Sequence, residues 1–308
     1  MKNIVVITGL TATGKTGLAI KMAKELGADI ISADSRQIYK GMDIGTGKDI
    51  GKSRFKSVLK LGQMDIGYHV IDGIRVWLLD IVEPSIGFSV SDYLLAFDEA
   101  YGQIKKRGRQ IIVAGGTGYY IDSLLNPKAN FGLAPNKTLR LILNKLPTKV
   151  IKTIYRLLNR RGFEKLNNSE KNNRHRLIRK IEVLLSRDDK NGKIEKKYGG
   201  RVMCLTAKNE VIYKRIDKRV KIRLDQGILA EVERLKNKYG WSAPGLNCLA
   251  YKEFKDYFEG TKNLMECVEK WTGDEHAYAR RQKTWFKKMK YEMIDIKKIA
   301  RREWYNNL

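Results

Sequence analysis

The amino-acid sequence predicts an α/β protein, in which a parallel sheet flanked by helices is interrupted by a small all-helical insertion. Short apolar runs alternate with amphipathic segments in the N-terminal part, which is the pattern of β-α-β units. Residues 127–198 break this alternation, because they are rich in Lys, Arg and Asn and lack a convincing strand. Strand character returns at 201–207, and helical patterns follow. We therefore predict a core made of residues 1–126 and 199–308, with an inserted helical domain at 127–198.

The core elements follow from the spacing of the apolar residues. Residues 4–8 ("IVVIT") are typical of a buried strand, and residues 15–26 of a helix with its apolar residues on one face. Further strands are expected at 28–32, 75–81 and 109–116, where apolar runs are bounded by turn signals. Parallel sheets of this kind bind ligands at the carboxyl ends of their strands, so a site is expected there.

Helices are expected both in the core and in the insertion. The stretch "SVSDYLLAFDEAYGQIKKRG" predicts a helix that is capped by Ser89 or Ser91 and ends at Gly108. In the insertion, helical spacing is carried by Ile178, Ile181, Leu184 and Leu185.

The stretch "ITGLTATGKTGLA" predicts a phosphate-binding loop between the first strand and the first helix. It matches G-x-x-x-x-G-K-[ST], so the predicted core is P-loop NTPase-like. Its glycines let main-chain amides face an anion at the positive end of a helix. Lys15 adds a positive charge, and the Thr16 hydroxyl is placed to ligate Mg²⁺. The residues expected to bind phosphate groups are Gly9, Thr11, Ala12, Thr13, Gly14, Lys15 and Thr16.

Two aspartates follow predicted strands and offer different chemistry. Asp34 comes just after 28–32, where a carboxylate near the phosphate loop could accept a proton from a nucleophile or could simply cap the next segment. Asp80 could hold a metal ion in a nucleotide hydrolase or kinase. The strand at 109–116 instead ends in two glycines and Thr117, which offer amides and a hydroxyl group.

Three arginines recur at i, i+4 and i+8 in "IYKRIDKRVKIRLDQG". They are Arg215, Arg219 and Arg223, and this spacing places them along one face of a helix. An adjacent face carries Ile212, Ile216 and Val220, which could pack on the core. Such a row either reaches a phosphate cluster or forms a solvated basic face, and the spacing allows both.

The charge balance points to a polyanionic partner. Lys and Arg number 61 against 34 Asp and Glu, giving a net charge of +27, although a lysine-rich proteome would produce the same excess. Two segments concentrate it: residues 149–180 hold 11 basic and 2 acidic residues, and residues 276–302 hold 10 basic and 2 acidic residues. Two separate basic segments are typical of a nucleic-acid footprint.

Cysteine usage and hydropathy indicate a cytoplasmic protein without a membrane anchor. The three cysteines form no CxxC pair, which argues against a disulfide framework and a zinc site and suits a reducing compartment. No apolar stretch approaches the roughly 18 residues that cross a bilayer. We expect a monomer.

Seven stretches taken in order resemble one enzyme family. They are "GLTATGKTGLAI", "IISADSRQIYKGMDIGTGK", "VAGGTGYYIDSLL", "NRHRLIRKIEV", "RIDKRVKIRLDQG", "CLAYKEFKDYFEG" and "RRQKTWFK". From about Ile4 to Lys288 the chain is similar to the tRNA dimethylallyltransferases, also called tRNA isopentenyltransferases. The string "SADSRQIYKGMDIGTGK" is the most specific part, because phosphate-loop proteins in general have no reason to carry it.

The resemblance implies transfer of a dimethylallyl group from its diphosphate to the exocyclic N6 amine of the adenosine beside the tRNA anticodon, with release of diphosphate. It implies that Asp34 accepts the amine proton and that Thr117 hydrogen-bonds the departing oxygen. Lys15, Thr16 and Arg219 would hold the diphosphate with Mg²⁺ near Thr16. The residues expected to contact the tRNA anticodon stem-loop are Asp34, Ser35, Arg36, Gln37, Thr117, Asn173, Arg174, His175, Arg176, Arg281 and Gln282.

Some positions depart from the family pattern. A pair of histidines is replaced by Val76 and Trp77, behind an extra segment "GYHVIDGI" at 67–74. His175 stands where a glutamine is expected.

Three other functions remain open on the sequence. An adenylate isopentenyltransferase shares the phosphate loop and the aspartate but uses a free nucleotide, which needs neither basic segment. A phosphate-loop NTPase or small-molecule kinase would use Asp80 for its metal ion. A nucleic-acid-binding module would carry a vestigial loop.

Overall fold

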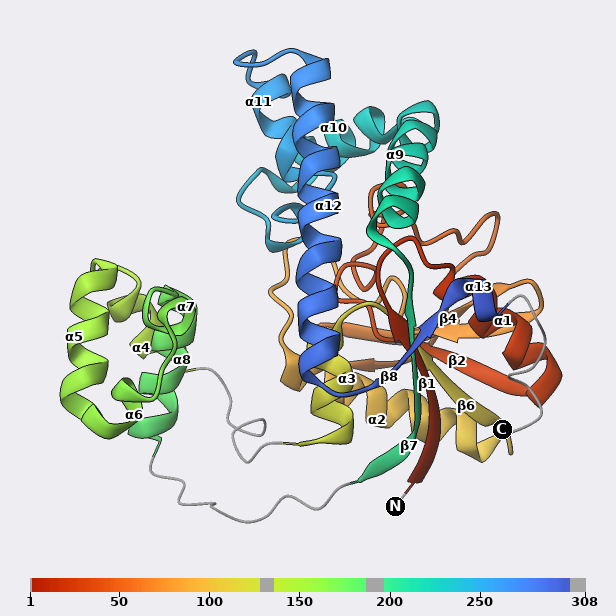
Figure 1. Cartoon of the computed structure of the whole chain (residues 1–308), viewed down its shortest axis with the longest axis horizontal. Coiled ribbons are helices and arrows are strands. Elements are labelled where there is room, and N and C mark those ends of the chain that lie inside the picture. The colour runs from red at the N-terminus through yellow and green to blue at the C-terminus, as the bar shows by residue number, and fades with distance from the viewer. Residues whose placement is uncertain (1, 128–135, 187–196, 300–308) are drawn as a thin grey trace. The chain divides into compact units, whose positions relative to one another are not determined.

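The computed structural model describes residues 2–127, 136–186 and 197–299 (Figure 1). It divides into two compact units, a core unit of Met1–Asn126 with Lys196–Leu308 and an insertion unit of Pro127–Glu195. Parts of the predicted insertion, at 128–135 and 187–196, lie outside the described residues, as does the end of the second basic segment at 300–302.

The core unit is built on one eight-stranded sheet, in the order β3-β4-β5-β2-β6-β1-β7-β8. The strands are β1 (Lys2–Gly9), β2 (Ala28–Ser32), β3 (Lys56–Leu61), β4 (Met64–Ile71), β5 (Ile74–Trp77), β6 (Gln110–Ala114), β7 (Tyr198–Thr206) and β8 (Glu292–Asp295). All neighbours from β5 to β8 pair in parallel, whereas β3-β4 and β4-β5 pair antiparallel. The predicted α/β fold with a parallel sheet is therefore confirmed.

Helices cover both faces of this sheet. The helices of the core unit are α1 (Lys15–Leu26), α2 (Val90–Lys106), α3 (Gly118–Leu125), α9 (Asn209–Asp225), α10 (Ile228–Tyr239), α11 (Lys255–Phe258), α12 (Leu264–Lys288) and α13 (Ile296–Ile299), with 3-10 turns at Pro244–Leu246 and Lys252–Phe254. The apolar face of α1 packs on one side of the sheet with Ile7 and Ile30, and α2 and α3 pack on the other with Val6 and Ile31. The hydrophobic core thus consists of two layers of apolar side chains, one on each face of the sheet.

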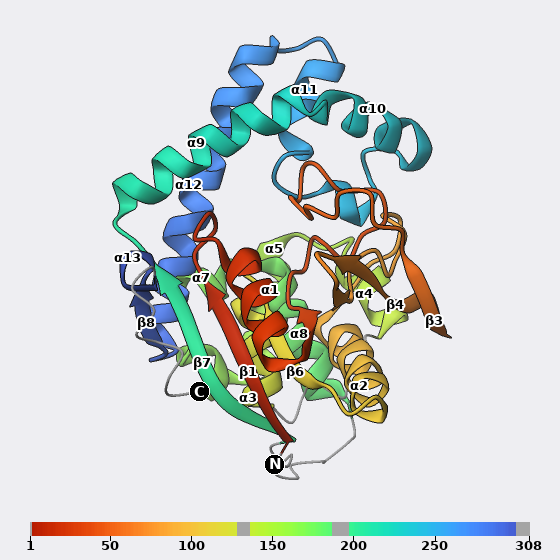
Figure 2. The same ribbon diagram turned by 90° about the vertical axis from the view of Figure 1, so that its right-hand side faces the viewer.

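The helices α9 to α11 and the N-terminal part of α12 lie beyond the carboxyl ends of the strands, whereas the C-terminal part of α12 runs down beside α3 (Figures 1 and 2). The predicted apolar face of α9 is confirmed, because Ile212, Ile216 and Val220 are all buried. This placement leaves the arginine row of α9 facing the edge at which the phosphate loop and β2 end. A ligand site at that edge follows from the topology.

The predicted boundaries hold for most of the core. The cap of α2 is Ser89 and not Ser91, because Ser89 and Asp92 form a reciprocal capping box, and the helix ends at Lys106, just before the expected Gly108. The strand predicted at 75–81 ends at Trp77, since Leu78 and Asp80 take positive φ values of 64° and 56° that a strand cannot continue through.

Three strands escaped the sequence analysis. β3 and β4 form a hairpin whose second strand continues into the extra segment at 67–74, and β4 turns into β5 at Asp72 and Gly73, both with positive φ. β8 follows α12, where only helix was expected, and pairs in parallel with β7. β3 and β8 are the two edge strands of the sheet and have only six and four residues, too few for a clear alternation, so their pairing partners decide their structure.

The insertion unit is helical, with α4 (Lys137–Leu143), α5 (Thr148–Leu158), α6 (Arg160–Glu164), α7 (Asn168–Lys171) and α8 (Arg174–Leu185). Its own small core includes Ile151, Phe163, Ile178 and Ile181. Leu184 and Leu185 share the helical spacing of the last two but are exposed. The unit therefore has a separate hydrophobic core.

The three cysteines are free and buried. Among the residues that the structure describes, no helix has the length and apolarity needed to cross a membrane.

Candidate active site

A cavity of about 1160 Å³ opens at the carboxyl ends of β1, β2 and β6 in the core unit. Its wall combines the phosphate loop, the segment after β2, the loop between residues 43 and 51 (the cavity loop), and residues of α9 and α12. Its polar lining includes Lys15, Asp34, Arg219, Glu275 and Arg281. The cavity thus collects most of the residues that the sequence singled out, from segments far apart in the chain.

The phosphate loop has the backbone needed for anion binding. Gly14 takes a left-handed φ of 85° at the N-cap of α1, where no side-chain cap is formed, so the amides at the start of the helix can bind an anion in the cavity. Thr13 is buried, and its hydroxyl donates to the carbonyl of Leu10 at 2.7 Å. Gly9 supports the loop from below, because a Cβ there would lie 2.1 Å from the carbonyl oxygen of Leu205.

The side chain of Lys15 is hydrogen-bonded to this loop, and its pKa is lowered. Its ammonium donates to the carbonyl of Leu10 at 2.7 Å. Burial lowers the pKa of Lys15 to about 8, an effect that Arg219 increases and the negative charge of Asp34 opposes. A bound polyanion would favour the charged form and so gain a stronger contact.

The arginine row of α9 runs from solvent into the protein. Arg215 is exposed and donates to the carbonyl of Ala12 at 3.2 Å. Arg219 donates to the Thr11 hydroxyl at 2.8 Å, so it touches the phosphate loop directly. Arg223 is buried, donates to the carbonyl of Gly45 at 2.9 Å, and has its pKa lowered to about 10 by burial and by Arg219. The row is therefore part of the cavity wall and not a solvated face.

Glu275 on α12 is a site residue that the sequence analysis missed. Its buried carboxylate lies 3.0 Å from the Arg219 guanidinium and 3.6 Å from that of Arg223. It neutralises part of the arginine row and joins α12 to α9. No motif marked this glutamate, since its partners are about 50 residues away in the chain.

Asp34 and Thr117 lie at neighbouring strand ends. The Asp34 carboxylate lines the cavity and accepts the Arg36 amide at 2.9 Å, so it also closes a local turn, as the alternative interpretation expected. The Thr117 hydroxyl accepts the Ser35 amide at 2.9 Å and lies 3.2 Å from the Ser35 hydroxyl. The strand ends approach so closely that a Cβ on Gly115 would lie 2.3 Å from the backbone of Ala33. Thr117 lies beside the cavity, and Ser35 belongs to its wall.

The cavity loop is fixed from the α9–α12 side of the wall. Glu231 on α10 accepts the amides of Asp43, Ile44 and Gly45 at 2.9 to 3.0 Å. The Gln37 amide donates to the carbonyls at 46 and 47 at 3.2 and 3.0 Å. Gln37 is therefore turned toward the protein, and Glu231 is a second residue that the sequence did not reveal.

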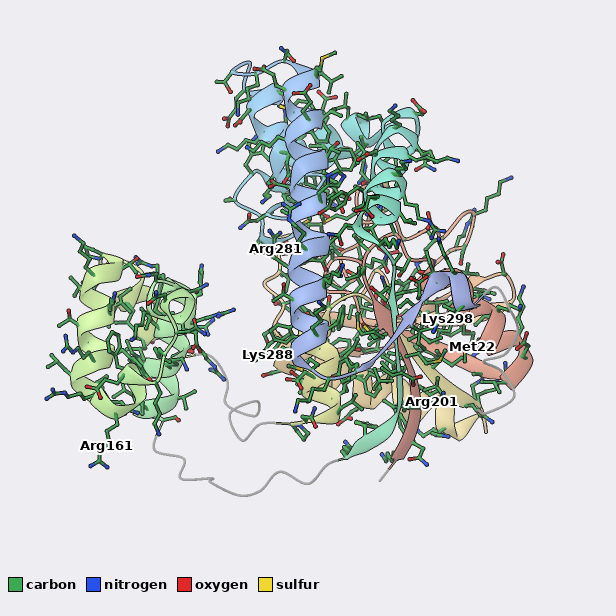
Figure 3. All side chains as sticks on the ribbon, viewed as in Figure 1. Met22, Arg161, Arg201, Arg281, Lys288 and Lys298 are labelled. Carbon is green, nitrogen blue, oxygen red and sulfur yellow. The ribbon has the colours of Figure 1, made fainter. Side chains whose placement is uncertain are left out.

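Gln282 is buried and joins two loops, which differs from the tRNA contact expected of it. Its side-chain oxygen accepts the Thr11 amide at 2.7 Å, and its side-chain nitrogen donates to the carbonyl of Gly116 at 3.0 Å. Both polar ends are thus used inside the protein, and the residue sets the position of the phosphate loop. Arg281, beside it on α12 (labelled in Figure 3), does belong to the residues that line the cavity.

Asp80 is not placed for the metal-binding role that an NTPase would require. Its carboxylate is paired with the buried ammonium of Lys48 and lies 2.9 Å from Nε2 of His69. Hydrogen bonds from His69 and Lys48 and the Lys48 charge outweigh burial and lower the pKa of Asp80. The carboxylate is therefore saturated by partners away from the phosphate loop.

The donor set fits a magnesium ion only together with a substrate. Thr16 is exposed on the cavity wall at the start of α1. The described residues contain no group of three or more His, Cys, Asp or Glu side chains that could enclose a metal ion. Mg²⁺ is commonly bound through one or two protein oxygens, phosphate oxygens and water, and a threonine hydroxyl beside a phosphate loop meets that requirement.

The four residues 173–176 lie at the start of α8 in the insertion unit. Asn173 is the N-cap, and its side chain accepts the amide of Arg176 at 3.0 Å. Arg174 donates to the carbonyl of Leu143 at 3.1 Å. His175 and Arg176 are exposed. Two of the four expected tRNA contacts thus have structural partners, and two are available to a ligand.

Comparisons with known proteins cover nearly the whole chain. The family model described as IPP transferase matches residues 37–289, and the one described as Isopentenyl transferase matches residues 2–60. A tRNA dimethylallyltransferase of Clostridioides difficile (strain 630) is 34% identical over 308 residues, covering 95% of this chain and 94% of that protein. One from Bacillus subtilis (strain 168) is 33% identical, covering 95% of this chain and 90% of that protein. The crystal structure of the full-length tRNA isopentenylpyrophosphate transferase of Bacillus halodurans has a TM-score of 0.66 at 28% identity, covering 96% of this chain and 90% of that one.

Proposed function

The chain belongs to the IPP transferase family, and from this premise we propose that it transfers a dimethylallyl group from dimethylallyl diphosphate to tRNA. The acceptor is the exocyclic N6 amine of the adenosine on the 3′ side of the anticodon, and diphosphate is released. The resemblance of the sequence to tRNA dimethylallyltransferases supports this proposal, and so do the relatives that carry that name.

One observation carries the proposal: a cationic cradle and a carboxylate share the same cavity. Lys15, Arg219 and the amides of the phosphate loop stand on one wall, and Asp34 stands at the neighbouring strand end. The two are close enough for the charge of Asp34 to act on the pKa of Lys15. A leaving diphosphate and an attacking amine need these two environments side by side.

The bond changes are simple. The amine nitrogen forms a bond to the allylic carbon while the bond from that carbon to the diphosphate oxygen breaks, and the electron pair leaves with the oxygen. Asp34 accepts the proton that the amine loses. Negative charge therefore moves toward the phosphate loop as the reaction proceeds, and the cations there stabilise it more in the transition state than before.

Thr117 acts on the departing oxygen. Its hydroxyl contacts Ser35 in the free protein, and a hydroxyl can rotate to donate to a ligand oxygen instead. Ser35 thus holds the Thr117 side chain in place until the donor binds. Mg²⁺ bound at Thr16 would supply further charge neutralisation to the diphosphate.

The target adenosine must leave its stack to enter the cavity, which costs a few kcal/mol. Contacts between basic residues and the tRNA backbone offset this cost and make binding depend on salt. The exposed Arg176 and the side chain of Arg161, which reaches away from the helices of its own unit in Figure 3, offer such charges in the insertion unit. Arg281 offers one at the cavity itself.

The test is a transfer assay with dimethylallyl diphosphate and unmodified tRNA, followed by mass measurement of the RNA. Asp34→Asn is expected to bind the donor normally and to lose 10²–10⁴-fold in the rate of transfer, because it removes only the proton acceptor. Thr117→Ala should slow the chemical step more than it weakens tRNA binding. An unchanged rate in Asp34→Asn would refute the base role of Asp34.

The same assay separates the rivals. Prenylation of AMP in place of tRNA would indicate the free-nucleotide enzyme, and turnover of ATP would indicate a nucleotide hydrolase or kinase. The pairing of Asp80 with Lys48 and His69 removes the residue on which the hydrolase interpretation depended.

A further inference from the structure

A cluster of polar side chains links the β3–β4 hairpin to the cavity loop. Its members are His69 on β4, Asp80 after β5, and Lys48 and Asp43 in the cavity loop. His69 and Lys48 are each only 2% exposed, so their polar atoms depend on partners within the protein. The cluster therefore connects β4 to the cavity loop through the buried pair of Asp80 and Lys48, with the half-exposed Asp43 as its outer member.

Lys48 connects the members of this cluster, because it contacts both Asp80 and Asp43. Its ammonium donates to the Asp80 carboxylate, to Oδ1 of Asp43 at 2.7 Å and to the carbonyl of Tyr39 at 2.6 Å. A buried ammonium without such partners costs several kcal/mol, so the position of Lys48 depends on where Asp80 is held. The main chain of Lys48 is part of the cavity loop. The contacts of the Lys48 side chain therefore help to fix the position of that loop.

His69 holds the other oxygen of Asp80. Its Nε2 lies 2.9 Å from Oδ2 of Asp80, and its Nδ1 lies 3.2 Å from the hydroxyl of Ser53. The Ser53 oxygen already accepts the amide of Val70 at 2.9 Å, so its own hydrogen is free to point at Nδ1. This arrangement makes Nε2 the donor to Asp80.

We propose that His69 is a positioning residue for the reaction, which fixes the cavity loop through Asp80 and Lys48. The β3–β4 hairpin thereby gains a function: β4 supplies the imidazole that holds the Asp80 carboxylate behind the cavity loop. The antiparallel register of β4 and β5 places His69 opposite Val76, close to the point where the chain leaves β5 for Asp80. The expected effect on activity rests on the proposed transfer reaction, whereas the effect on the loop does not.

The experiment compares His69→Leu with His69→Gln in the full chain. Leucine fills the space without donating, whereas the glutamine amide can place a donor where Nε2 stood. Two quantities are measured: the rate of trypsin cleavage after Lys48, relative to cleavage after the exposed Arg54, and kcat/KM for transfer to tRNA. Lys60→Ala, on the exposed strand of the same hairpin, is the matched control.

His69→Leu is expected to raise relative cleavage after Lys48 at least tenfold, because the loop loses its anchor and opens locally. It should lower kcat/KM by 10–100-fold, since small displacements of a site wall are costly. His69→Gln should restore most of both, and Lys60→Ala should change neither. If His69→Leu does not fold, Ser53→Ala, which removes the partner of Nδ1, provides the same comparison with a smaller expected change.

The proposal is overturned if His69→Leu leaves relative cleavage after Lys48 unchanged. It is also overturned if glutamine fails to restore what leucine removes, because the imidazole would then act by packing alone. Should the wild-type protein transfer nothing to tRNA while His69→Leu still exposes Lys48, the proposed function fails and the positioning of the loop by His69 stands.

Discussion

Arg219 on α9 and Glu275 on α12 lie 3.0 Å apart across the cavity wall, and the same carboxylate reaches Arg223 at 3.6 Å. Two guanidinium groups therefore share one buried anion. The wall keeps its positive charge toward the phosphate loop through Arg219, which also contacts Thr11. This pairing decides both how stable the wall is and how much charge it offers to a ligand.

Removing Glu275 should destabilise the protein. Glu275→Ala leaves the Arg219 and Arg223 guanidinium groups facing each other without an anion, and breaking such a buried pair costs about 3–5 kcal/mol. Glu275→Gln keeps an acceptor oxygen and should cost less than half as much. The free energy of unfolding in urea measures both. A loss below about 1 kcal/mol in the alanine variant would mean that solvent already screens the pair.

Affinity for the allylic diphosphate should fall as pH rises from 7 to 9. The pKa of Lys15 is lowered to about 8, so its ammonium is charged below this pH and neutral above it. If the charged form binds, the dissociation constant of a stable donor analogue should rise about tenfold over this range. Calorimetry measures it. Lys15→Arg stays charged at pH 9 and should bind with little pH dependence, whereas an equal slope in both proteins would assign the titration to another group.

Glu253 should make the protein less stable above neutral pH. Its side chain is fully buried, neither carboxylate oxygen has a hydrogen-bond partner among the described residues, and the half-exposed Lys252 ammonium lies 3.6 Å from Oε1. Burial raises its pKa to about 7 from 4.5, so the folded state holds a proton that the unfolded chain has released. Stability from this group is complete below pH 4.5, falls as pH rises through this window, and is lost above about 7.

Glu253→Gln removes the loss of stability that ionisation of the buried carboxyl group causes. It should raise the free energy of unfolding at pH 8 by on the order of 1–3 kcal/mol and leave it nearly unchanged at pH 4.5. Glu269→Gln, an exposed glutamate of α12, is the control and should change neither value. Equal gains at both pH values in Glu253→Gln would contradict a titration of this carboxyl group.

Arg174 and Arg176 should differ in their roles. Arg174 should contribute to the stability of the insertion unit, and Arg176 should contribute to tRNA binding. Arg176 is exposed, and Arg176→Ala should reduce the slope of tRNA affinity against salt by about 1, as loss of one phosphate contact requires. Arg174 donates to the carbonyl of Leu143, so Arg174→Ala should also lower the stability of the insertion unit. Binding at several salt concentrations and thermal unfolding measure the two effects. An unaltered slope in Arg176→Ala would place the tRNA footprint elsewhere.

Local pattern was sufficient to predict much of the core. The apolar runs at 4–8, 28–32 and 109–116 form β1, β2 and β6, and "GLTATGKT" forms the turn between β1 and α1. These features depend on neighbours within a few residues, such as the Ser89–Asp92 cap or the left-handed Gly14. Asp34, the arginine row and the resemblance to the family could be read from the chain for the same reason.

The features of the site that the sequence pattern did not predict depend on contacts between distant segments of the chain. Glu231 and Glu275 are ordinary helix residues until the fold brings three amides and two guanidinium groups to them. From the sequence, Asp80 could have held a metal ion in a nucleotide hydrolase or kinase. In the fold its carboxylate is paired with Lys48 and His69.

The sequence by itself determined which segments form strands, where the phosphate loop lies and which family the chain resembles, because those properties are written in short stretches. Only the tertiary structure decided which charges meet in the cavity and which are already satisfied, because the free energy of a buried charge depends on the partners that folding places around it.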